Sequence, residues 1–286
     1  MAAETGRSLA LPRHRSLPLP GGGRSLPLIM GIVNVNRDSF FAGSRAPGPR
    51  EAVQAALDMV NQGADIIDFG AESTRPGSIE IDPRVELDRL LPALSGFRAA
   101  SDAVVSIDTR HPEVAEATLD AGADIINDIE GLARPGMADV IARARASVVI
   151  MHMRGTPATM QDNPEYADCG AEVLAFLRAA AARAVAAGIP AESIILDPGI
   201  GFGKRQEHNL ALLKGIDRIA ALGYPVLIGV SRKRLIGELT GREIADRLSG
   251  SLGAALAAWR NGADILRVHD VRETIDALTT FSEVLR

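Results

Sequence analysis

From residue 28 onward, short apolar runs rich in isoleucine and valine alternate with longer segments in which apolar residues recur at helical spacing. A continuous apolar run is typical of a parallel strand that is buried on both faces. We expect strands at 28–34, 64–69, 104–108, 123–127, 147–152, 193–197, 225–230 and 263–268. We expect helices at 49–62, 83–99, 112–121, 136–145, 165–187, 208–222, 245–261 and 271–285.

One phrase occurs three times, as QGADIIDFG at 62–70, AGADIINDI at 121–129 and NGADILRVH at 261–269. In each copy a glycine would end a helix, and a strand follows after a tight turn. Repetition of this unit indicates a closed α/β architecture, and eight units match the size of a (β/α)8 TIM barrel of about 250 residues. A doubly wound open sheet is the alternative. That fold usually has a glycine-rich turn after its first strand, and residues 30–45 contain no GxGxxG.

Composition narrows the classes of function. A net charge of −5 argues against nucleic-acid binding, because a phosphate backbone attracts basic surfaces. No apolar run approaches the ~20 residues of a membrane helix, and the start of the chain has no apolar core of a signal peptide, so we expect a cytoplasmic protein without membrane partners. The single cysteine, Cys169, excludes an intrachain disulfide and a cysteine-rich metal site.

Residues 1–27 differ in composition from the rest of the chain. They contain four arginines and one glutamate, and they repeat Arg-Ser-Leu at Arg7, Arg15 and Arg24. Because proline, glycine and serine dominate this segment, we expect a flexible N-terminal extension before one catalytic domain at 28–286; pairing as an edge segment near residues 25–28 is the alternative.

Polar residues follow the expected strands, and in a TIM barrel the active site lies at these strand ends. Asp197 precedes Pro198 and several glycines that let the loop approach a ligand. Its carboxylate can accept two N–H bonds from a planar heterocycle, and Asp108 and Asn127 can do the same from other strands. Since neighbouring strand residues face opposite sides, only one of Asn127 and Asp128 should face the lumen.

Basic residues gather at the ends of the last two strands. Arg267 and His269 alternate with one apolar residue, so both should point the same way, as a basic pair at the usual phosphate site of this fold. The sequence SRKR at 231–234 precedes an expected helix N-terminus, which attracts anions; a solvated basic turn is the other interpretation. His152 is either a site residue or a core histidine bonded to the backbone.

Taken together, these phrases resemble the dihydropteroate synthase family. The matching segments lie within 28–286 and include GIVNV, DFGAESTRPG, SIDTRHPEV, GADIINDI, MHMRGTPATMQ, ILDPGIGFGK, SRK, RLSGSL and RVHDV. The resemblance implies an enzyme of folate biosynthesis that joins 6-hydroxymethyl-7,8-dihydropterin pyrophosphate to p-aminobenzoate. The products would be 7,8-dihydropteroate and pyrophosphate. It also implies Mg²⁺ and a homodimer formed through the last helices.

The resemblance also assigns roles to individual residues. The residues expected around the pterin are Asp108, Asn127, Ile129, Met151, Asp197, Phe202 and Lys233. Those expected around the pyrophosphate are Asn34, Arg267 and His269, with Mg²⁺ near Asn34. Those expected around p-aminobenzoate are Thr74, Arg75 and Pro76 of one loop, with Ser231 and Arg234. The residues expected to act in catalysis are Asp108, Asp197, Lys233 and Arg267.

The first loop departs from the family pattern. Many members read NVTPDSF, whereas this chain reads NVNRDSF at 34–40, so Asn36-Arg37 replaces a Thr-Pro pair and removes a restraint on the loop. Arg37 either adds a charge contact or loosens the loop. Two other functions stay open: a methyltetrahydrofolate:corrinoid methyltransferase, which would need no pyrophosphate site, and a non-catalytic pterin-binding protein.

Overall fold

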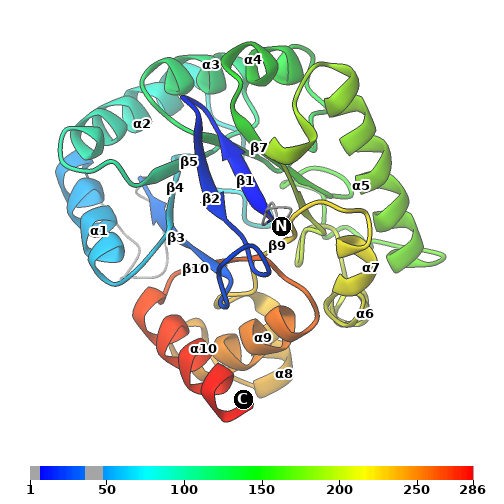
Figure 1. Cartoon of the computed structure of the whole chain (residues 1–286). Helices are drawn as coiled ribbons and strands as arrows, with labels where there is room; N and C mark the ends of the chain where they lie inside the picture. The colour runs from blue at the N-terminus through cyan, green and yellow to red at the C-terminus, as the bar shows by residue number, and fades with distance from the viewer. Residues whose placement is uncertain (1–6, 36–47, 286) are drawn as a thin grey trace, which may run out of the picture.

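The computed structural model describes residues 7–35 and 48–285, so Asn36 and Arg37 of the first loop lie outside the described residues. Within the described part of the chain, eight parallel strands form one sheet in the order β8-β7-β6-β5-β4-β3-β10-β9. A parallel bridge between Leu196 and Val226 joins the two edges of this sheet. The sheet therefore closes into a barrel surrounded by helices (Figure 1), which confirms the expected TIM barrel over the open sheet.

The barrel strands coincide with the expected apolar runs. They are β3 (Leu28–Asn34), β4 (Ile66–Gly70), β5 (Val104–Asp108), β6 (Ile125–Asp128), β7 (Ser147–Met151), β8 (Ile194–Asp197), β9 (Leu227–Ile228) and β10 (Ile265–Val268). The α-helices are α1 (Pro49–Asn61), α2 (Pro83–Arg98), α3 (Pro112–Asp120), α4 (Met137–Ala144), α5 (Cys169–Ala186), α6 (Gln206–Lys214), α7 (Ile216–Ala220), α8 (Arg234–Thr240), α9 (Leu248–Arg260) and α10 (Val271–Leu285). Short 3₁₀ turns occur at η2 (Ala191–Ser193) and η3 (Ile244–Asp246).

Local signals explain where the helices begin. Proline stands in the first turn of α1, α2 and α3, where its missing N–H has no partner to lose. Asp82 caps α2 by accepting the N–H of Arg84, which satisfies one unpaired donor at the helix start. The expected helix at 208–222 is interrupted at Gly215 and forms α6 and α7. In the described part of the chain, no helix combines the length and apolar character that a membrane span requires.

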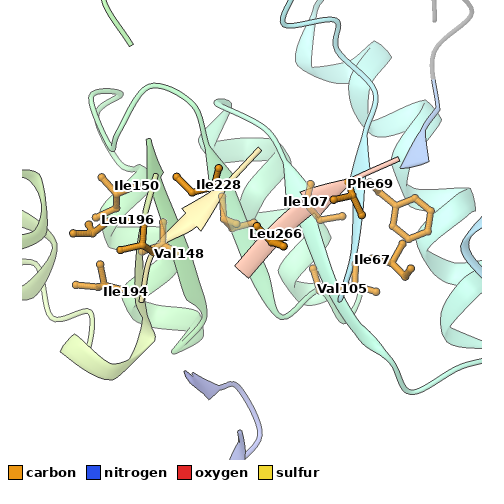
Figure 2. Packing of buried hydrophobic residues seen from close by; sticks show 14 of the residues in the cluster. Ile67, Phe69, Val105, Ile107, Val148, Ile150, Ile194, Leu196, Ile228 and Leu266 are labelled. Atoms are coloured by element: carbon orange, nitrogen blue, oxygen red, sulfur yellow. The ribbon is translucent and has the colours of Figure 1, made fainter. Parts of the chain in front are cut away.

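The main hydrophobic core lies between the barrel and the helices. Figure 2 shows outward-facing strand residues of this layer, including Phe69 of β4, Ile107 of β5 and Leu196 of β8. Phe69 packs edge-on against Phe97 of α2, with ring centroids 5.6 Å apart. Because the strands are buried on this face as well as in the lumen, they read as continuous apolar runs in the sequence.

A second, smaller core fills the amino-terminal half of the lumen. One inward residue from each barrel strand belongs to it, and β3 contributes two; the set is Leu28, Met30, Ile66, Val104, Ile125, Val149, Ile195, Leu227 and Ile265. Three leucines from the N-terminal segment, Leu9, Leu11 and Leu19, complete this core and are 0%, 6% and 1% exposed. The barrel floor is therefore sealed by residues that precede the first barrel strand.

The expectation of a flexible N-terminal extension is wrong for residues 7–27. Strands β1 (Ser8–Leu11) and β2 (Arg15–Pro18) form an antiparallel hairpin, which lies across the end of the barrel in Figure 1. Proline and glycine suggested disorder, but the alternate leucines of this segment gain a buried environment by covering the floor of the lumen.

The repeated arginines of the hairpin segment pair with the repeated GAD aspartates. Arg7 donates two bonds to Asp264, Arg24 donates two to Asp65, and Arg15 binds Asp124 at 3.1 Å. Each aspartate also accepts a backbone N–H from a neighbouring barrel segment, at Val226, Ile29 and Val105 respectively. The two sequence repeats thus form three corresponding charge-assisted contacts at the amino-terminal end of the barrel.

Candidate active site

A polar layer lies above the apolar lumen core, toward the carboxyl ends of the strands. Alternate strand residues face the lumen, and the inward side changes from Ile66 to Asp68 along β4 and from Ile265 to Arg267 along β10. Most of the predicted site residues also face the lumen, because they lie two or four positions beyond a lumen-facing residue of the same strand. The alternation therefore gathers them at one end of the barrel.

A cavity of about 840 Å³ opens at this end. Most predicted site residues line it, namely Asn34, Thr74, Arg75, Pro76, Asp108, Phe202, Ser231, Lys233, Arg234, Arg267 and His269. The others are buried in the barrel and are Asn127, Ile129, Met151 and Asp197, with exposures of 4%, 3%, 2% and 7%. Asn127 and Asp197 are nevertheless connected to cavity residues through the contacts that follow.

Arg267 lies between two carboxylates at the base of the cavity. Its Nε donates to Asp68 Oδ2 at 2.6 Å and its Nη2 donates to Asp108 Oδ2 at 2.8 Å. Asp68 Oδ2 also accepts the Asn127 amide at 3.2 Å, and Asp68 is fully buried. Asp68 was not among the predicted site residues, yet it connects side chains from β4, β6 and β10.

The prediction that only one of Asn127 and Asp128 faces the lumen is confirmed. Asn127 points to Asp68, whereas Asp128 accepts the backbone N–H groups of Glu130 and Leu132, both at 2.8 Å. Asp128 therefore stabilises the loop after β6, and Asn127 supplies a polar group to the site.

Burial changes the proton affinities of the central charged groups. It raises the pKa of Asp108 to about 7, while Arg267 beside it acts in the opposite direction. Burial also raises the pKa of Asp197 and lowers the pKa of Lys233 to about 8, and each of these two groups partly offsets the shift of the other. Oppositely charged side chains are thus held in a desolvated site.

The glycine-rich loop at 198–203 forms one wall of the site. Gly199 donates its N–H to Asp197 Oδ1 at 2.7 Å. A side chain at Gly199 would overlap the carbonyl oxygen of His152, and its φ of +69° favours glycine, so the loop packs directly on the end of β7. Lys233 donates to the Ile200 carbonyl and lies 4.8 Å from the Phe202 ring centre. The loop therefore places an aromatic ring and a cation at the cavity wall.

The side chain of Lys204 binds the backbone of this loop. Its contacts also decide whether His152 is a site residue or a core histidine. Its ammonium contacts His152 Nδ1 at 2.9 Å and donates to the carbonyls of His152 and Phe202 at 3.2 and 2.8 Å. Burial lowers the pKa of Lys204 to about 7 and the pKa of His152 to about 3. His152 is therefore a neutral core histidine. Lys204 is a cavity residue that was missed, because nothing in GFGK alone says where its lysine points.

The anion site predicted at Arg267 and His269 has one positive charge rather than two. His269 contacts Ser231 Oγ through its backbone N–H at 3.2 Å and its Nδ1 at 3.0 Å. Burial, together with the charge of Arg267, lowers the pKa of His269 to about 3, so the imidazole is neutral. The expectation of a basic pair is corrected: Arg267 supplies the charge, and His269 can supply only hydrogen bonds.

The four residues of SRKR serve different purposes. Arg232 makes a two-bond ion pair with Asp270, at 2.8 Å for each bond, and supports the loop. Lys233 points into the site, and Arg234 lies at the cavity mouth paired with Glu238 at 2.7 Å. Neither prior interpretation, an anion site or a solvated turn, therefore describes the whole segment.

Comparison with known proteins accounts for this arrangement. A model of the pterin binding enzyme family matches residues 30–269. The dihydropteroate synthase of Escherichia coli K12 is 43% identical over 261 residues, which is 91% of this chain and 93% of that protein. The chain belongs to the dihydropteroate synthase family.

Solved structures of the family show the same fold. Xanthomonas albilineans dihydropteroate synthase with 4-aminobenzoic acid has a TM-score of 0.89 and 43% identity, with 98% of this chain and 99% of that chain covered. Thermus thermophilus dihydropteroate synthase in complex with 6HMPPP has a TM-score of 0.82 and 43% identity, with 97% and 100% covered. The span matched by the family model, 30–269, includes every residue that we predicted for the site.

Proposed function

We propose that this protein is a dihydropteroate synthase that condenses 6-hydroxymethyl-7,8-dihydropterin pyrophosphate with p-aminobenzoate, giving 7,8-dihydropteroate and pyrophosphate. The observation that carries the proposal is one cavity in which Arg267 lies against two carboxylates, close to the lysine and aromatic ring of a glycine loop. An anionic leaving group and a flat, hydrogen-bonding heterocycle each find suitable partners there. The relatives named above add independent support.

The pterin would bind deep in the barrel. Asp197 still has acceptor capacity beyond its bond to Gly199, and an aminopyrimidine edge presents the N–H donors that it lacks. Asn127 and Asp108 would complete the edge recognition, since strands β5 and β6 are neighbours. The apolar residues Ile129, Met151 and Phe202 would contact the ring faces.

The pyrophosphate would bind toward the cavity mouth. Arg267 carries the positive charge, and a guanidinium suits two-bond recognition of phosphate oxygens. His269 would add a neutral hydrogen bond. Developing charge on the leaving group is thereby stabilised where it forms, which accelerates the reaction more than ground-state binding does.

Asn34 suits an additional Mg²⁺ bound together with the pyrophosphate. It lines the cavity at the end of β3, the strand beside β10, and its amide oxygen is a hard ligand of the kind Mg²⁺ prefers. Such ions commonly use one or two protein oxygens together with substrate phosphates and water. When bound, Mg²⁺ would neutralise charge on the leaving pyrophosphate.

Bond cleavage would leave positive charge on the exocyclic carbon of the pterin. The carboxylates of Asp108 and Asp197 would stabilise this charge, while Arg267 holds the departing anion. The neutral arylamine of p-aminobenzoate then attacks the carbon, and the new C–N bond is completed when the nitrogen loses one proton to solvent. Thr74, Arg75, Pro76, Ser231 and Arg234 would form the surroundings of the arylamine. An uncharged aniline nitrogen needs little help from a general base.

A single-turnover assay tests the proposal directly. Enzyme in excess over the pyrophosphorylated dihydropterin should release pyrophosphate and form dihydropteroate when p-aminobenzoate is added. Binding of the pterin without pyrophosphate release would identify a non-catalytic protein. Omitting Mg²⁺ should weaken binding of the pyrophosphorylated pterin in the wild type, and this difference should shrink in Asn34→Ala.

We also infer a homodimer formed through the last helices. Leu252 and Leu256 of α9 and Phe281 and Val284 of α10 line a mostly apolar groove, and Val284 is 78% exposed. A second copy of the chain would cover this surface. Light scattering should give twice the chain mass for the wild type and a smaller mass for Val284→Asp; a monomeric wild type at micromolar concentration would refute the inference.

A further inference from the structure

The loop between β4 and α2, at 71–82, forms part of the cavity wall through Thr74, Arg75 and Pro76. Within this loop, Ser78 donates its N–H to the Arg75 carbonyl at 3.0 Å, and Gly77 donates to the Pro157 carbonyl at 2.9 Å. Glu72 precedes these residues in the loop and Glu80 follows them. The side chains of both join one cluster of charged residues. The position of the cavity wall therefore depends on that cluster.

Glu72 forms the first anchor. Both of its carboxylate oxygens accept bonds from Arg110, to Nη2 at 2.5 Å and to Nε at 3.2 Å. The two side chains are only 4% and 6% exposed. Arg110 lies two residues after Asp108, and its Nη1 donates to Glu130 at 2.8 Å. This anchor thus connects the loop to the ends of β5 and β6.

Glu80 forms the second anchor. It is bonded by His111 Nε2 at 2.8 Å and by Arg134 Nη2 at 2.6 Å. On its other side, His111 Nδ1 lies 2.6 Å from Glu86, which is fully buried in α2. Arg134 also donates to Glu130 at 2.8 Å. Because Glu130 binds both Arg110 and Arg134, the two anchors belong to one connected network.

The chemistry of His111 makes the second anchor depend on protonation. A carboxylate faces each ring nitrogen, and only the imidazolium can donate to both. The bond to Glu86, helped by the bond to Glu80, raises the pKa of His111 despite its burial. His111 and Arg134 in turn lower the pKa of Glu80 to about 2.

The cluster is better described as an ion-pair network than as a metal site. Donor atoms of Glu72, Glu86 and His111 lie within 4.8 Å of one another. However, Arg110 occupies both oxygens of Glu72, and a guanidinium at that position would repel a cation. The four acidic groups of the network, Glu72, Glu80, Glu86 and Glu130, face three cations, Arg110, Arg134 and protonated His111.

We propose that Arg110 and His111 are positioning residues for the second substrate: through Glu72 and Glu80 they hold the 71–82 loop so that Thr74, Arg75 and Pro76 are placed for p-aminobenzoate. This inference rests on the proposed function. None of the network residues needs to touch the pterin, so the network should govern capture of the arylamine alone.

The sign of the pH dependence follows from the direction of the shift. A histidine whose pKa is raised on folding contributes its ion pairs fully at low pH and loses them as the pH rises through the folded value. Glu86 from α2, Glu80 from the loop, and Arg134 and Arg110 from the neighbouring strand ends are the charged groups that face His111 or its partners. The second anchor should therefore weaken as the pH rises through the raised pKa of His111, while the bond from Arg134 to Glu80 remains.

Glu80→Gln is the sharpest test, because this side chain is 46% exposed and its replacement should not prevent folding. We expect the KM for p-aminobenzoate to rise about tenfold, since two charge-assisted bonds become neutral. The Kd of the pyrophosphorylated pterin should stay within about twofold of the wild type, since the pterin contacts lie elsewhere. The rise in KM with pH that we expect for the wild type should disappear in this variant. Glu116→Gln, which removes an exposed ion pair with Arg143, is the matched control.

Hydrogen exchange provides a readout that does not require activity. Amides at 73–79 should exchange faster in Glu80→Gln and in His111→Gln than in the wild type, and the double variant should add little to either. Unchanged exchange and unchanged KM in both single variants would overturn the proposal, as would equal losses for the two substrates. Absence of turnover in the wild type would instead refute the proposed function and leave the exchange result interpretable.

Discussion

Asp124 offers a direct test of how the N-terminal hairpin stabilises the barrel. Its carboxylate is fully buried and accepts bonds from Arg13, Arg15 and Arg98 and from the backbone N–H of Val105. Asp124→Asn keeps the size of the side chain but removes its charge, and it replaces one acceptor oxygen with a donor. The substitution should therefore weaken every contact without creating a cavity.

The magnitude follows from the number and exposure of the partners. A hydrogen bond to a charged group contributes about 1.5–3 kcal/mol, against about 0.5–1.5 kcal/mol for a neutral one, so each arginine loses about 1 kcal/mol. Arg13 and Arg15 are 50% and 35% exposed and can recover hydration, whereas Arg98 is 18% exposed. After that discount we expect a total loss of about 2 kcal/mol. For a chain of this size, this lowers Tm by about 4 °C.

Thermal unfolding followed by calorimetry measures this loss. Asp65→Asn is the matched control, because Asp65 pairs with the single Arg24, and its Tm should fall by about half as much. Replacing Arg13 and Arg15 together by glutamine should destabilise the wild type but have little further effect on Asp124→Asn. Full additivity of these changes, or an unchanged Tm for Asp124→Asn, would show that the hairpin is not held by this carboxylate.

Further predictions concern the active site. Asp197→Asn should weaken pterin binding by about 2–3 kcal/mol, because the new side-chain NH2 group would face an N–H donor of the pterin. Unchanged affinity in calorimetry would remove Asp197 from the site. Arg267→Ala should weaken binding of the pyrophosphorylated pterin far more than binding of the bare pterin, and equal losses would make Arg267 a pterin or structural residue. The rate kcat/KM should rise with pH as Asp108 ionises, with a pKa of about 7, and fall as Lys233 loses its proton, with a pKa of about 8. Asp108→Asn should abolish the acid limb, and a profile with that limb intact would assign it to another group.

The barrel could be predicted because its strands are buried on both sides. Continuous apolar runs and the GAD repeat located the barrel strands to within a few residues. Strand alternation also predicted correctly that Asn127 and Asp128 face opposite sides of the barrel wall, since the facing of a strand residue depends only on its position along the strand. The same reasoning placed Arg267 in the lumen. These features depend on neighbours along the chain.

The features that were missed depend on partners far away in sequence. The hairpin segment is rich in proline and glycine, and its leucines are ordered only because a barrel floor lies beneath them. Asp68 and Arg267 are separated by 199 positions, so no local pattern shows that they pair. The charge of His269 was predicted from its residue type, whereas burial decides it. A short motif identifies a residue, but its protonation state is set by the folded surroundings.

The aspartates that face the hairpin accept more hydrogen bonds than Asp108 and Asp197 of the candidate site. At the amino-terminal end, Asp124 accepts four bonds and Asp264 accepts three. At the carboxyl-terminal end, and within the described residues, Asp108 accepts one from Arg267 and Asp197 accepts one from Gly199. An ionised carboxylate has about four acceptor sites, and leaving them unused in a buried position is unfavourable. The unused acceptors of Asp108 and Asp197 therefore lie where a ligand that carries N–H donors would bind. Asp128 and Asp270, at the same end of the barrel, instead stabilise loops through two bonds each.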